Sequence, residues 1–499
     1  MLGFSAFGAE GAFAEVASIM SASAVEAGGH GAPASPFSVI PFVILLTMIA
    51  TGPLFYEKFW HHNYPKVAIG LALVVVVYYL FGLHNHAAPL HAFFEYFQFI
   101  SLLSALYIAS GGIMINIDRK GTPLANTVLL VIGAIISNII GTTGASMLLI
   151  RPFIRLNKGR ISAYHIIFFI FMVSNVGGAL TPIGDPPLFL GFLKGVPFEW
   201  TLEHSFTPWV FGIGLLAILF FFVDKRQGAK EGDLIEDNSN AEYTNKISFT
   251  GAKNFLWLVL VIVAIFIDPA KLNWVPAVIE HTDGSLGIST IPAAKEAGTY
   301  LTGFSFIREL IMLSVAYFSF TLADKRAIEG NDFNFEPIRE VAFIFVGIFG
   351  TMMPALELVA SFAASPEGAA LITHNTLYWG TGTLSGILDN APTYLNFFTA
   401  ALAAKGGDIG NLQDVVAFTE GAQQFGGIEA IIELRAISVS AVFFGAMTYI
   451  GNGPNFMVKS IAEQIGIEMP SFFGYIVRYS LPILLPILFL TWLAFFAFV

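Results

Sequence analysis

Two stretches of the chain carry the same run of Gly, Pro and oxygen-bearing side chains. Residues 178–187 read GALTPIGDPP and residues 445–454 read GAMTYIGNGP, so six of ten positions are identical and Asp185 is aligned with Asn452. Gly and Pro interrupt helices, while Thr, Asp and Asn provide the oxygens that an ion or a polar substrate needs. Where such paired breaks occur in the two halves of a membrane protein, they predict the binding site of a transporter.

The composition places these stretches in a lipid bilayer. Of the 499 residues, 56% are hydrophobic and 12% are charged, and the mean hydropathy is +0.72, whereas soluble domains carry about 25% charged residues. The absence of cysteine excludes disulfides and cysteine-based zinc sites and counts against redox chemistry. The net charge of −11 counts against nucleic acid as a partner. We predict an integral membrane protein without a bound cofactor.

Apolar runs long enough to enter a bilayer recur along the whole chain, which predicts an all-α polytopic membrane protein. The runs are 37–56, 66–83, 90–115, 121–158, 162–194, 205–223, 253–268, 301–323, 337–361, 372–403, 430–462 and 472–498. They divide the chain into four predicted parts. The parts are an outside N-terminal segment at 1–36, a first membrane half at 37–223, a connecting region at 224–300 with one span at 253–268, and a second membrane half at 301–499.

The basic residues predict an orientation and, from it, a first re-entrant hairpin. With the N-terminus outside, 18 of the 24 Lys and Arg residues fall on the inner side, as the positive-inside rule requires. Lys120 and Lys158 then flank the run 121–158 on the same side, so this run must enter and leave from one face. Its predicted turn is Gly141-Thr142-Thr143-Gly144, and such irregular backbone is tolerated only where protein or a water-filled cavity satisfies it.

The second half holds a predicted counterpart of this hairpin at 372–403. Aligning Ser137 with Ser385 sets Gly141-Thr142 opposite Asp389-Asn390. In both halves a hairpin precedes a broken helix, at 162–194 and at 430–462. The charge rule sends the first broken helix outward and the second inward. We therefore predict inverted-topology repeats with two re-entrant hairpins and two broken transmembrane helices.

A family resemblance rests on residues 174–187, which read SNVGGALTPIGDPP. This segment resembles the signature of the ion transporter superfamily, in particular the branch of D-type sodium/proton antiporters, arsenite pumps and citrate carriers. The resemblance covers roughly residues 95–225 and 335–499. It implies a scaffold and a moving transport domain, cation sites at hairpin tips and broken helices beside a central substrate site, and a homodimer.

Two departures from the dicarboxylate branch leave the substrate open. That branch typically has Thr before the double proline and Ser-Asn-Thr at the hairpin tips, whereas this chain has Asp185, Gly-Thr-Thr-Gly and Asp-Asn-Ala-Pro. The end of the second broken helix, residues 452–455, reads NGPN and resembles carboxylate-transporting relatives as much as antiporters.

Two carboxylates inside predicted membrane elements are the central candidates for ion binding. A mid-membrane Asp costs about 2.5–3.5 kcal/mol on insertion scales, so it needs a partner or a function. Burial disfavours the charged carboxylate and a bound cation favours it, so H⁺ and Na⁺ can compete for Asp185 and Asp389. Structural capping of the following half-helices is the competing interpretation. The further candidate ligands are Thr142, Thr143, Asn175, Thr181, Asn390, Thr393, Thr448, Asn452 and Asn455.

These features favour secondary active transport in a bacterial inner membrane. The first hypothesis is exchange of Na⁺ or Li⁺ for H⁺ by alternating access, and the second is cation-coupled uptake of citrate or another small organic anion. A membrane enzyme using the two aspartates as acids and a passive channel are the remaining alternatives. The chain has no Gly-x4-Gly-Lys-Ser/Thr phosphate loop, which argues against direct use of ATP.

Overall fold

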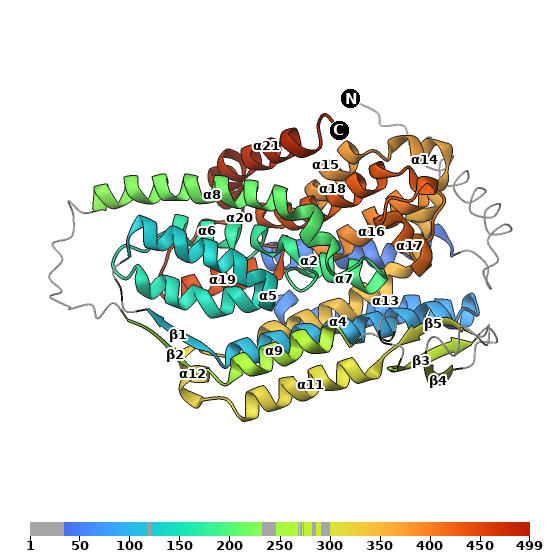
Figure 1. Cartoon of the computed structure of the whole chain (residues 1–499), viewed down its shortest axis with the longest axis horizontal. Helices are drawn as coiled ribbons and strands as arrows, with labels where there is room; N and C mark the ends of the chain where they lie inside the picture. The colour runs from blue at the N-terminus through green and yellow to red at the C-terminus, as the bar shows by residue number, and fades with distance from the viewer. Residues whose placement is uncertain are drawn as a thin grey trace.

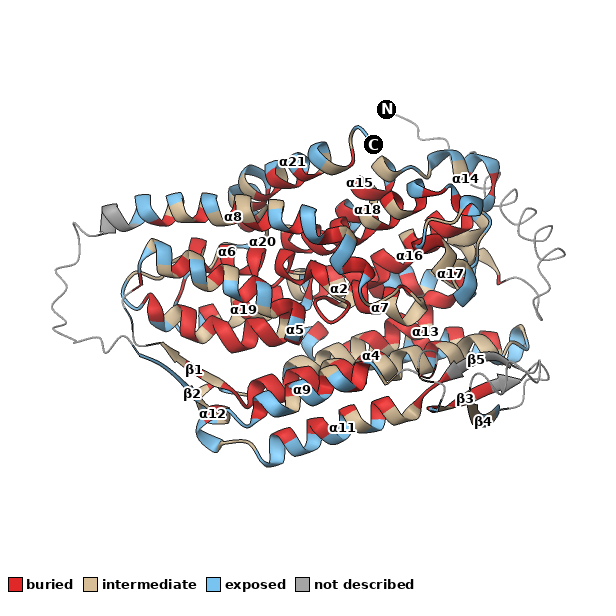
Figure 2. Ribbon diagram, viewed as in Figure 1, coloured by how far each residue is buried: buried red, intermediate tan, exposed pale blue. Residues whose placement is uncertain are grey.

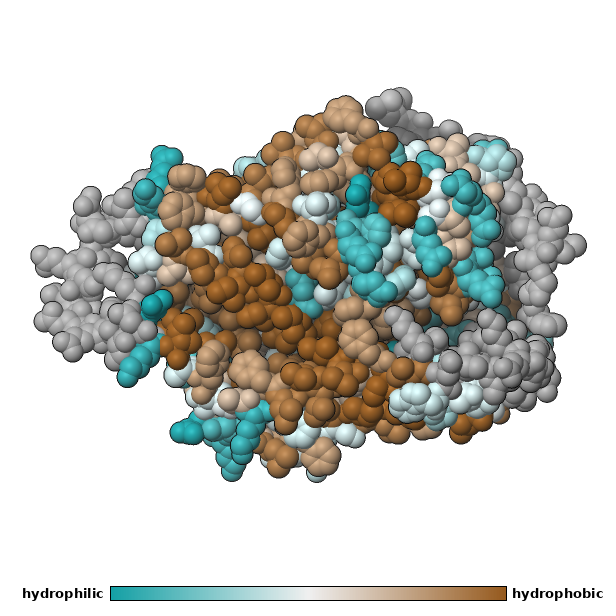
Figure 3. Space-filling view, in the orientation of Figure 1, coloured by the Kyte–Doolittle hydropathy of each residue, from teal (hydrophilic) through white to brown (hydrophobic). Residues whose placement is uncertain are grey.

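The computed structural model describes residues 34–117, 119, 121–231, 246–267, 269, 272, 274–281, 286–290 and 300–499. Nearly all of the predicted outside segment 1–36 lies outside these residues, as does much of the connecting region 224–300. Within them, nine helices are long and apolar enough to cross a membrane. The protein is therefore an all-α polytopic membrane protein, and brown apolar side chains cover much of the middle of the face in Figure 3.

One layer of the molecule is a group of helices that pack side by side. These are α2 (Ile40–Phe55), α3 (Glu57–Val77), α4 (Ala87–Gly111), α9 (Asn254–Ile265), α11 (Phe306–Thr321) and α13 (Glu336–Ala364). Small residues allow close approach, since a Cβ added at Gly350 of α13 would lie 2.6 Å from the Cβ of Ala72 in α3. Asn254 joins three helices by donating to the carbonyl oxygens of Ala109 and Ser319, both at 3.1 Å.

The helix α5 (Pro123–Leu156) doubles back on itself, and we call it hairpin 1. Gly141, at its turn, has the positive φ of 79° that favours glycine. Asn126 and Asn157, near its two ends, exchange side-chain hydrogen bonds of 2.7 and 2.8 Å. A straight helix would hold residues that far apart in sequence roughly 45 Å from each other, so the two arms of hairpin 1 are antiparallel.

Hairpin 2 consists of α15 (His374–Ser385) and α16 (Asn390–Ala403). Its two arms are in contact, because a Cβ added at Gly380 would lie 3.0 Å from the ring of Phe397. In Figure 1 the two hairpins extend from opposite ends of the long axis toward the centre of the molecule. The turns of both hairpins lie in this central region, which Figure 2 shows as mostly buried.

Each hairpin is followed by an interrupted helix. The first runs through α6 (Ala163–Met172), the short 3₁₀ turn η3 (Val176–Leu180) and α7 (Pro186–Lys194). The second runs through α18 (Ile428–Phe444), η5 (Gly445–Met447) and α19 (Gly453–Gln464). We call residues 173–185 break 1 and residues 445–452 break 2. A proline stands at one of the first two positions of the helix after each break, where its missing N–H is not needed.

The remaining elements cover the ends and sides of this arrangement. They are η1 (Pro36–Val39), η2 (Tyr78–Gly82), α8 (Trp200–Glu231), α12 (Lys325–Gly330), α14 (Pro366–Leu371), α17 (Leu412–Thr419), η4 (Gln423–Phe425), α20 (Phe472–Tyr475), η6 (Ile476–Leu484) and α21 (Leu485–Phe495). Two small antiparallel sheets were not predicted. One pairs β1 (Met114–Ile117) with β2 (Ile247–Thr250), and the other has the order β4 (Leu286–Thr290), β3 (Pro276–His281), β5 (Tyr300–Phe304).

Two predicted spans are shorter in the structure than in the sequence analysis. The run 253–268 forms α9 with 12 residues, which rises roughly 18 Å, and the run 301–323 begins as β5 before the 16 residues of α11. The hydrocarbon core of a bilayer is about 30 Å thick. The single span expected in the connecting region therefore stays a prediction.

Candidate functional site

The two breaks have the same backbone plan. Gly184 donates its N–H to the hydroxyl of Thr181 at 3.2 Å, and Gly451 donates its N–H to the hydroxyl of Thr448 at 3.1 Å. A Cβ at Gly184 would collide with the carbonyl of Gly178, and a Cβ at Gly451 would lie 2.6 Å from the carbonyl oxygen of residue 445. Each break is thus a loop in which backbone packs on backbone, and only glycine fits.

The residue that follows each of these glycines faces the other half of the molecule. Asn452 donates its side-chain amide to Oδ1 of Asp185 at 2.8 Å. Thr142, at the tip of hairpin 1, donates its hydroxyl to the same oxygen at 2.7 Å. Asn390, at the tip of hairpin 2, donates its amide to Oδ2 of Asp185 at 2.6 Å. All four side chains are at most 2% exposed, and we call them the Asp185 cluster.

The Asp185 cluster unites the two hairpin tips and the two breaks at a single carboxylate. The alignment that set Gly141-Thr142 opposite Asp389-Asn390 is consistent with this geometry, because Thr142 and Asn390 donate to the two oxygens of one side chain. The full hydrogen bonding offsets the cost of placing a carboxylate away from water. The structure shows no side-chain cap from Asp185 to α7, so simple capping does not explain this residue.

Two further asparagines form a layer beside the cluster. Asn175 donates its amide to the side-chain oxygen of Asn455 at 2.6 Å. Asn455 donates in turn to the carbonyl oxygens of Gly445 and Thr448 at 2.8 and 2.9 Å. The side-chain oxygen Oδ1 of Asn175 is buried and has no hydrogen-bond donor among the described residues. It is an available oxygen close to the Asp185 cluster, since it lies 2.9 Å from a Cβ built on Gly445, and the amide of Asn390 lies 3.3 Å from that point.

Four of the other predicted site residues, Asp389, Thr393, Thr181 and Thr448, contact the local backbone. Asp389 caps α16 by accepting the N–H of Ala391 at 3.0 Å, and Thr393 donates to the carbonyl of Asp389 at 2.9 Å. The hydroxyls of Thr181 and Thr448 hold the backbone of the two breaks. These contacts are structural. Thr143 and Asp389 also line the cavity beside the cluster.

The cavity has a volume of about 520 Å³, which is within the usual range of about 300–1,000 Å³ for small-molecule sites. Four helical segments begin at its wall: the second arm of hairpin 1 after Gly141, α7 at Pro186, α16 at Asn390 and α19 at Gly453. Helix N-termini carry partial positive charge, so their convergence favours an anion. Two of these segments, the second arm of hairpin 1 and α16, contribute donors to the carboxylate of Asp185, and the third donor, Asn452, immediately precedes α19.

Sequence reasoning missed Asn138, three residues before the turn of hairpin 1. Its amide donates to the carbonyl oxygen of Gly177 at 2.6 Å, and its oxygen accepts the N–H of Leu180 at 2.8 Å. The side chain thereby replaces helical hydrogen bonds that break 1 lacks. An asparagine inside an apolar run was the signal, because such a side chain needs partners within the protein.

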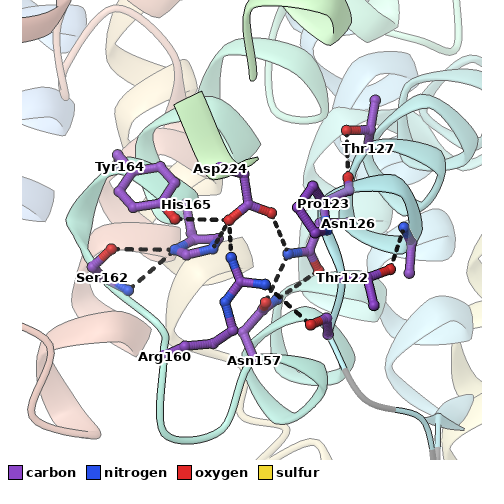
Figure 4. A network of polar contacts seen from close by, with 12 residues as sticks. Thr122, Pro123, Asn126, Thr127, Asn157, Arg160, Ser162, Tyr164, His165 and Asp224 are labelled. Carbon is purple, nitrogen blue, oxygen red and sulfur yellow. Dashed lines mark hydrogen bonds and ion pairs between the residues drawn. The ribbon is translucent and has the colours of Figure 1, made fainter. Parts of the chain in front are cut away.

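Sequence reasoning also missed a buried polar network at the base of hairpin 1 (Figure 4). Its centre is Asp224 of α8, which is fully buried and accepts hydrogen bonds from Asn126 and Tyr164, both at 2.8 Å. Arg160 forms an ion pair with Asp224, and Nε2 of His165 lies 3.2 Å from it. The network ties the open end of hairpin 1 to α6 and α8.

Hairpin 2 has a simpler ion pair at its own base, at the other end of the molecule. Lys405 follows α16 and lies 3.2 Å from Glu433 and 3.4 Å from Glu429, both on α18. Each hairpin is therefore joined at its open end to the first half of the interrupted helix that follows it.

No curated protein matches the chain in a sequence comparison. A family model described as "Putative citrate transport" matches residues 32–496, which include both hairpins, both breaks and the cavity. That match agrees with the resemblance to the ion transporter superfamily found from residues 174–187, and with a transporter rather than an enzyme. The chain belongs to this citrate-transport family of the ion transporter superfamily.

Proposed function

We propose that the protein is a secondary transporter that couples the movement of citrate, or another small organic anion, to a cation. The observation that carries this proposal is the convergence of four helix N-termini on a cavity of about 520 Å³. A bare Na⁺ or Li⁺ ion does not need a space of this size. The family description supports the same substrate class. Cation-coupled uptake of an organic anion is therefore favoured over Na⁺(Li⁺)/H⁺ exchange.

The Asp185 cluster is the proposed coupling element. In the present arrangement, two amides and one hydroxyl direct their hydrogens at Asp185, and this arrangement repels a cation. Rotation of the Asn390 and Asn452 amides would present oxygens in place of N–H groups, and Asn175 already offers a free one. A cation or proton on Asp185 would then release the hairpin-tip donors to the carboxylate of the substrate.

The remaining proposed ligands act from the edge of this cluster. Asp389 and Thr143 lie at the cavity wall, where Asp389 is proposed to offer Na⁺ the carboxylate oxygen that does not accept the N–H of Ala391. Thr181, Thr393, Thr448 and Asn455 shape the unwound backbone whose carbonyl oxygens complete a cation shell in discontinuous helices.

The alternating-access motion is proposed to use inverted-topology repeats. The support is the opposite direction of the two hairpins, the matched hydrogen bonds from a Gly N–H to a Thr hydroxyl in the two breaks, and the polar contacts at each hairpin base. Both hairpins are proposed to be re-entrant. The natural chain has no cysteine, so single cysteines introduced at Arg155 and Gly410 can be labelled from each side. We expect residue 155 inside and residue 410 outside, and finding both on one face would exclude the inverted arrangement.

Exchange of Na⁺ or Li⁺ for H⁺ is the second candidate function. The buried carboxylate of Asp185 and the free oxygen of Asn175 favour it, because protons and small cations compete for such oxygens. In this alternative the large cavity is a water-filled access path to the ion site.

Purified protein in vesicles with an internal pH indicator separates the two functions. We expect an imposed pH gradient to change when citrate and a cation are added together, and no change with Na⁺ or Li⁺ alone. Asp185→Asn vesicles are the matched control for leak. Dissipation of the gradient by Na⁺ or Li⁺ alone would reject organic-anion transport in favour of antiport. Equal citrate uptake with and without ion gradients would indicate a passive channel.

The family resemblance also leads us to propose a homodimer in a bacterial inner membrane. The apolar surface of the described helices requires a bilayer environment. Mass measurement of the detergent-solubilised protein tests the dimer, and fractionation of the source membranes tests the location.

A further inference from the structure

Arg151 lies on the wall of the cavity, on the second arm of hairpin 1. Its side chain is only 12% exposed, and its Nη1 is buried without a hydrogen-bond partner among the described residues. The nearest charge is Asp332, whose carboxylate lies 3.5 Å from Nε of Arg151 and whose side chain is 81% exposed. An exposed partner at this distance is weakly held, so another carboxylate can replace Asp332 at Nε.

Arg151 lies on the same helix face as Thr143, which is at the tip of hairpin 1. Thr143, Met147 and Arg151 are spaced four residues apart, which puts them on one helix face, and all three line the cavity. Among the described lining residues Arg151 is the one Lys or Arg side chain. The second helix arm rises roughly 12 Å from Thr143 to Arg151, and an arginine side chain reaches back along much of that length.

We propose that Arg151 is the carboxylate-binding residue of this cavity and selects organic anions with two or three carboxylates. One carboxylate would meet the guanidinium while another reaches toward the donors at the hairpin tips. The guanidinium matches a carboxylate through two parallel N–H···O bonds, and the Nε edge, where Asp332 now lies 3.5 Å away, is the edge that would receive it. The proposal rests on organic-anion transport as the proposed function and names how the anion is recognised.

The two exposed acidic side chains at the cavity rim weaken this attraction little. Asp332 and Glu336 have side chains that are 81% and 59% exposed, so solvent screens their charges. Glu340 lies deeper on the same wall, with His61 also at the lining. A dicarboxylate or tricarboxylate that binds Arg151 would displace Asp332 into solvent, where that carboxylate is already mostly hydrated.

A cysteine at Ser460 can report on occupancy of the cavity. Ser460 lies on the α19 side of the lining, and the chain has no natural cysteine. We would measure the rate at which a maleimide labels Ser460→Cys in purified protein, at increasing citrate, succinate or acetate. We expect citrate and succinate to slow labelling at concentrations at which acetate does not.

The matched variants are Arg151→Gln and Arg155→Gln in the Ser460→Cys background. Arg155 is one turn farther along the same helix, is exposed, and bonds Asn116 and the carbonyl of Gly330 instead of lining the cavity. We expect Arg151→Gln to raise the half-protecting citrate concentration about tenfold or more, because losing a hydrogen bond to a charged group weakens binding by about that factor. We expect Arg155→Gln to leave this concentration unchanged. Arg151→Lys keeps the charge without the planar fork, so protection by citrate should be intermediate.

The outcomes distinguish this inference from the proposed function. Equal protection in Arg151→Gln and the parent, or no protection by any of the three acids, would overturn the role of Arg151. Protection that depends on Arg151 in a protein that moves no citrate in vesicles would reject transport of citrate and leave the anion site in place. If Arg151→Gln does not elute as a folded protein, the comparison of Arg151→Lys with Arg155→Lys decides by the same measure.

Discussion

The two breaks share a backbone and differ in charge. Both hold a Thr hydroxyl against a Gly N–H three residues later, and both place an extended polar residue before the next helix. That residue is Asp185 in break 1 and Asn452 in break 2. The backbone plan is therefore repeated, whereas the carboxylate occurs once.

The residues common to both breaks shape the backbone of the site, and the residue that differs supplies its charge. The glycines and threonines that maintain the interrupted helices occur in both breaks. The hydrogen bond from Asn452 to Asp185 exists only because the repeat is not identical. A second carboxylate at residue 452 would repel the first, while a second amide at residue 185 would leave no carboxylate in the two breaks.

The largest expected effect comes from replacing the glycines that pack against backbone in the two breaks. Gly184→Ala and Gly451→Ala should each lower stability by about 1–3 kcal/mol or more, because the new Cβ meets backbone carbonyl atoms that cannot move aside. Gly453→Ala is the control, since nothing lies within 4 Å of a Cβ built there. Thermal unfolding in detergent measures the three variants. Similar unfolding temperatures for all three would show that the breaks do not need glycine.

A smaller effect is expected when the charge is moved from one break to the other. The double variant Asp185→Asn/Asn452→Asp keeps one carboxylate and one amide in contact, so it should fold and retain part of the cation dependence of transport. Asn452→Asp alone places two carboxylates within hydrogen-bonding distance and should be less stable than the double variant. Equal stability of these two variants would mean that the contact between the breaks contributes nothing.

The smallest effect is expected at Asp389, whose carboxylate caps its own helix. Asp389→Asn should leave stability nearly unchanged, because Asn is as good an N-cap, whereas Asp389→Ala should lose about 1 kcal/mol. Transport by Asp389→Asn should fall less than transport by Asp185→Asn. A complete loss of transport in a stably folded Asp389→Asn protein would instead assign this carboxylate a direct role in ion binding.

The sequence predicted the two breaks and hairpin 1 better than it predicted the side-chain contacts between them. Repeated Gly and Pro located both breaks, and the basic residues around 121–158 predicted a hairpin that turns at Gly141. The partners of Asp185 were not predictable, because Thr142, Asn390 and Asn452 come from three segments whose approach depends on tertiary packing. The sequence also could not tell that the threonines at 181 and 448 bond to backbone, since hydroxyls serve loops and ligands equally well.

Two other features depended on long-range partners. Asp224 appeared as the start of a polar connector, yet it is buried by hairpin 1 and α6. Arg151 appeared as one of many inner basic residues, and the cavity and its burial distinguish it from the exposed Arg155 on the same helix. Hydropathy and charge patterns describe a residue's neighbours in sequence, and these two side chains act through neighbours in space.

In the proposed mechanism, the carboxylate of Asp185 couples anion movement to a cation. The most direct test of this coupling compares the normal protein with Asp185→Asn in vesicles, measuring citrate uptake driven by an imposed cation gradient and citrate exchange without any gradient. We predict that Asp185→Asn loses gradient-driven accumulation and keeps exchange, because the amide preserves the shape of the site but binds no proton. Accumulation of citrate by the Asp185→Asn protein to the normal level would contradict the account.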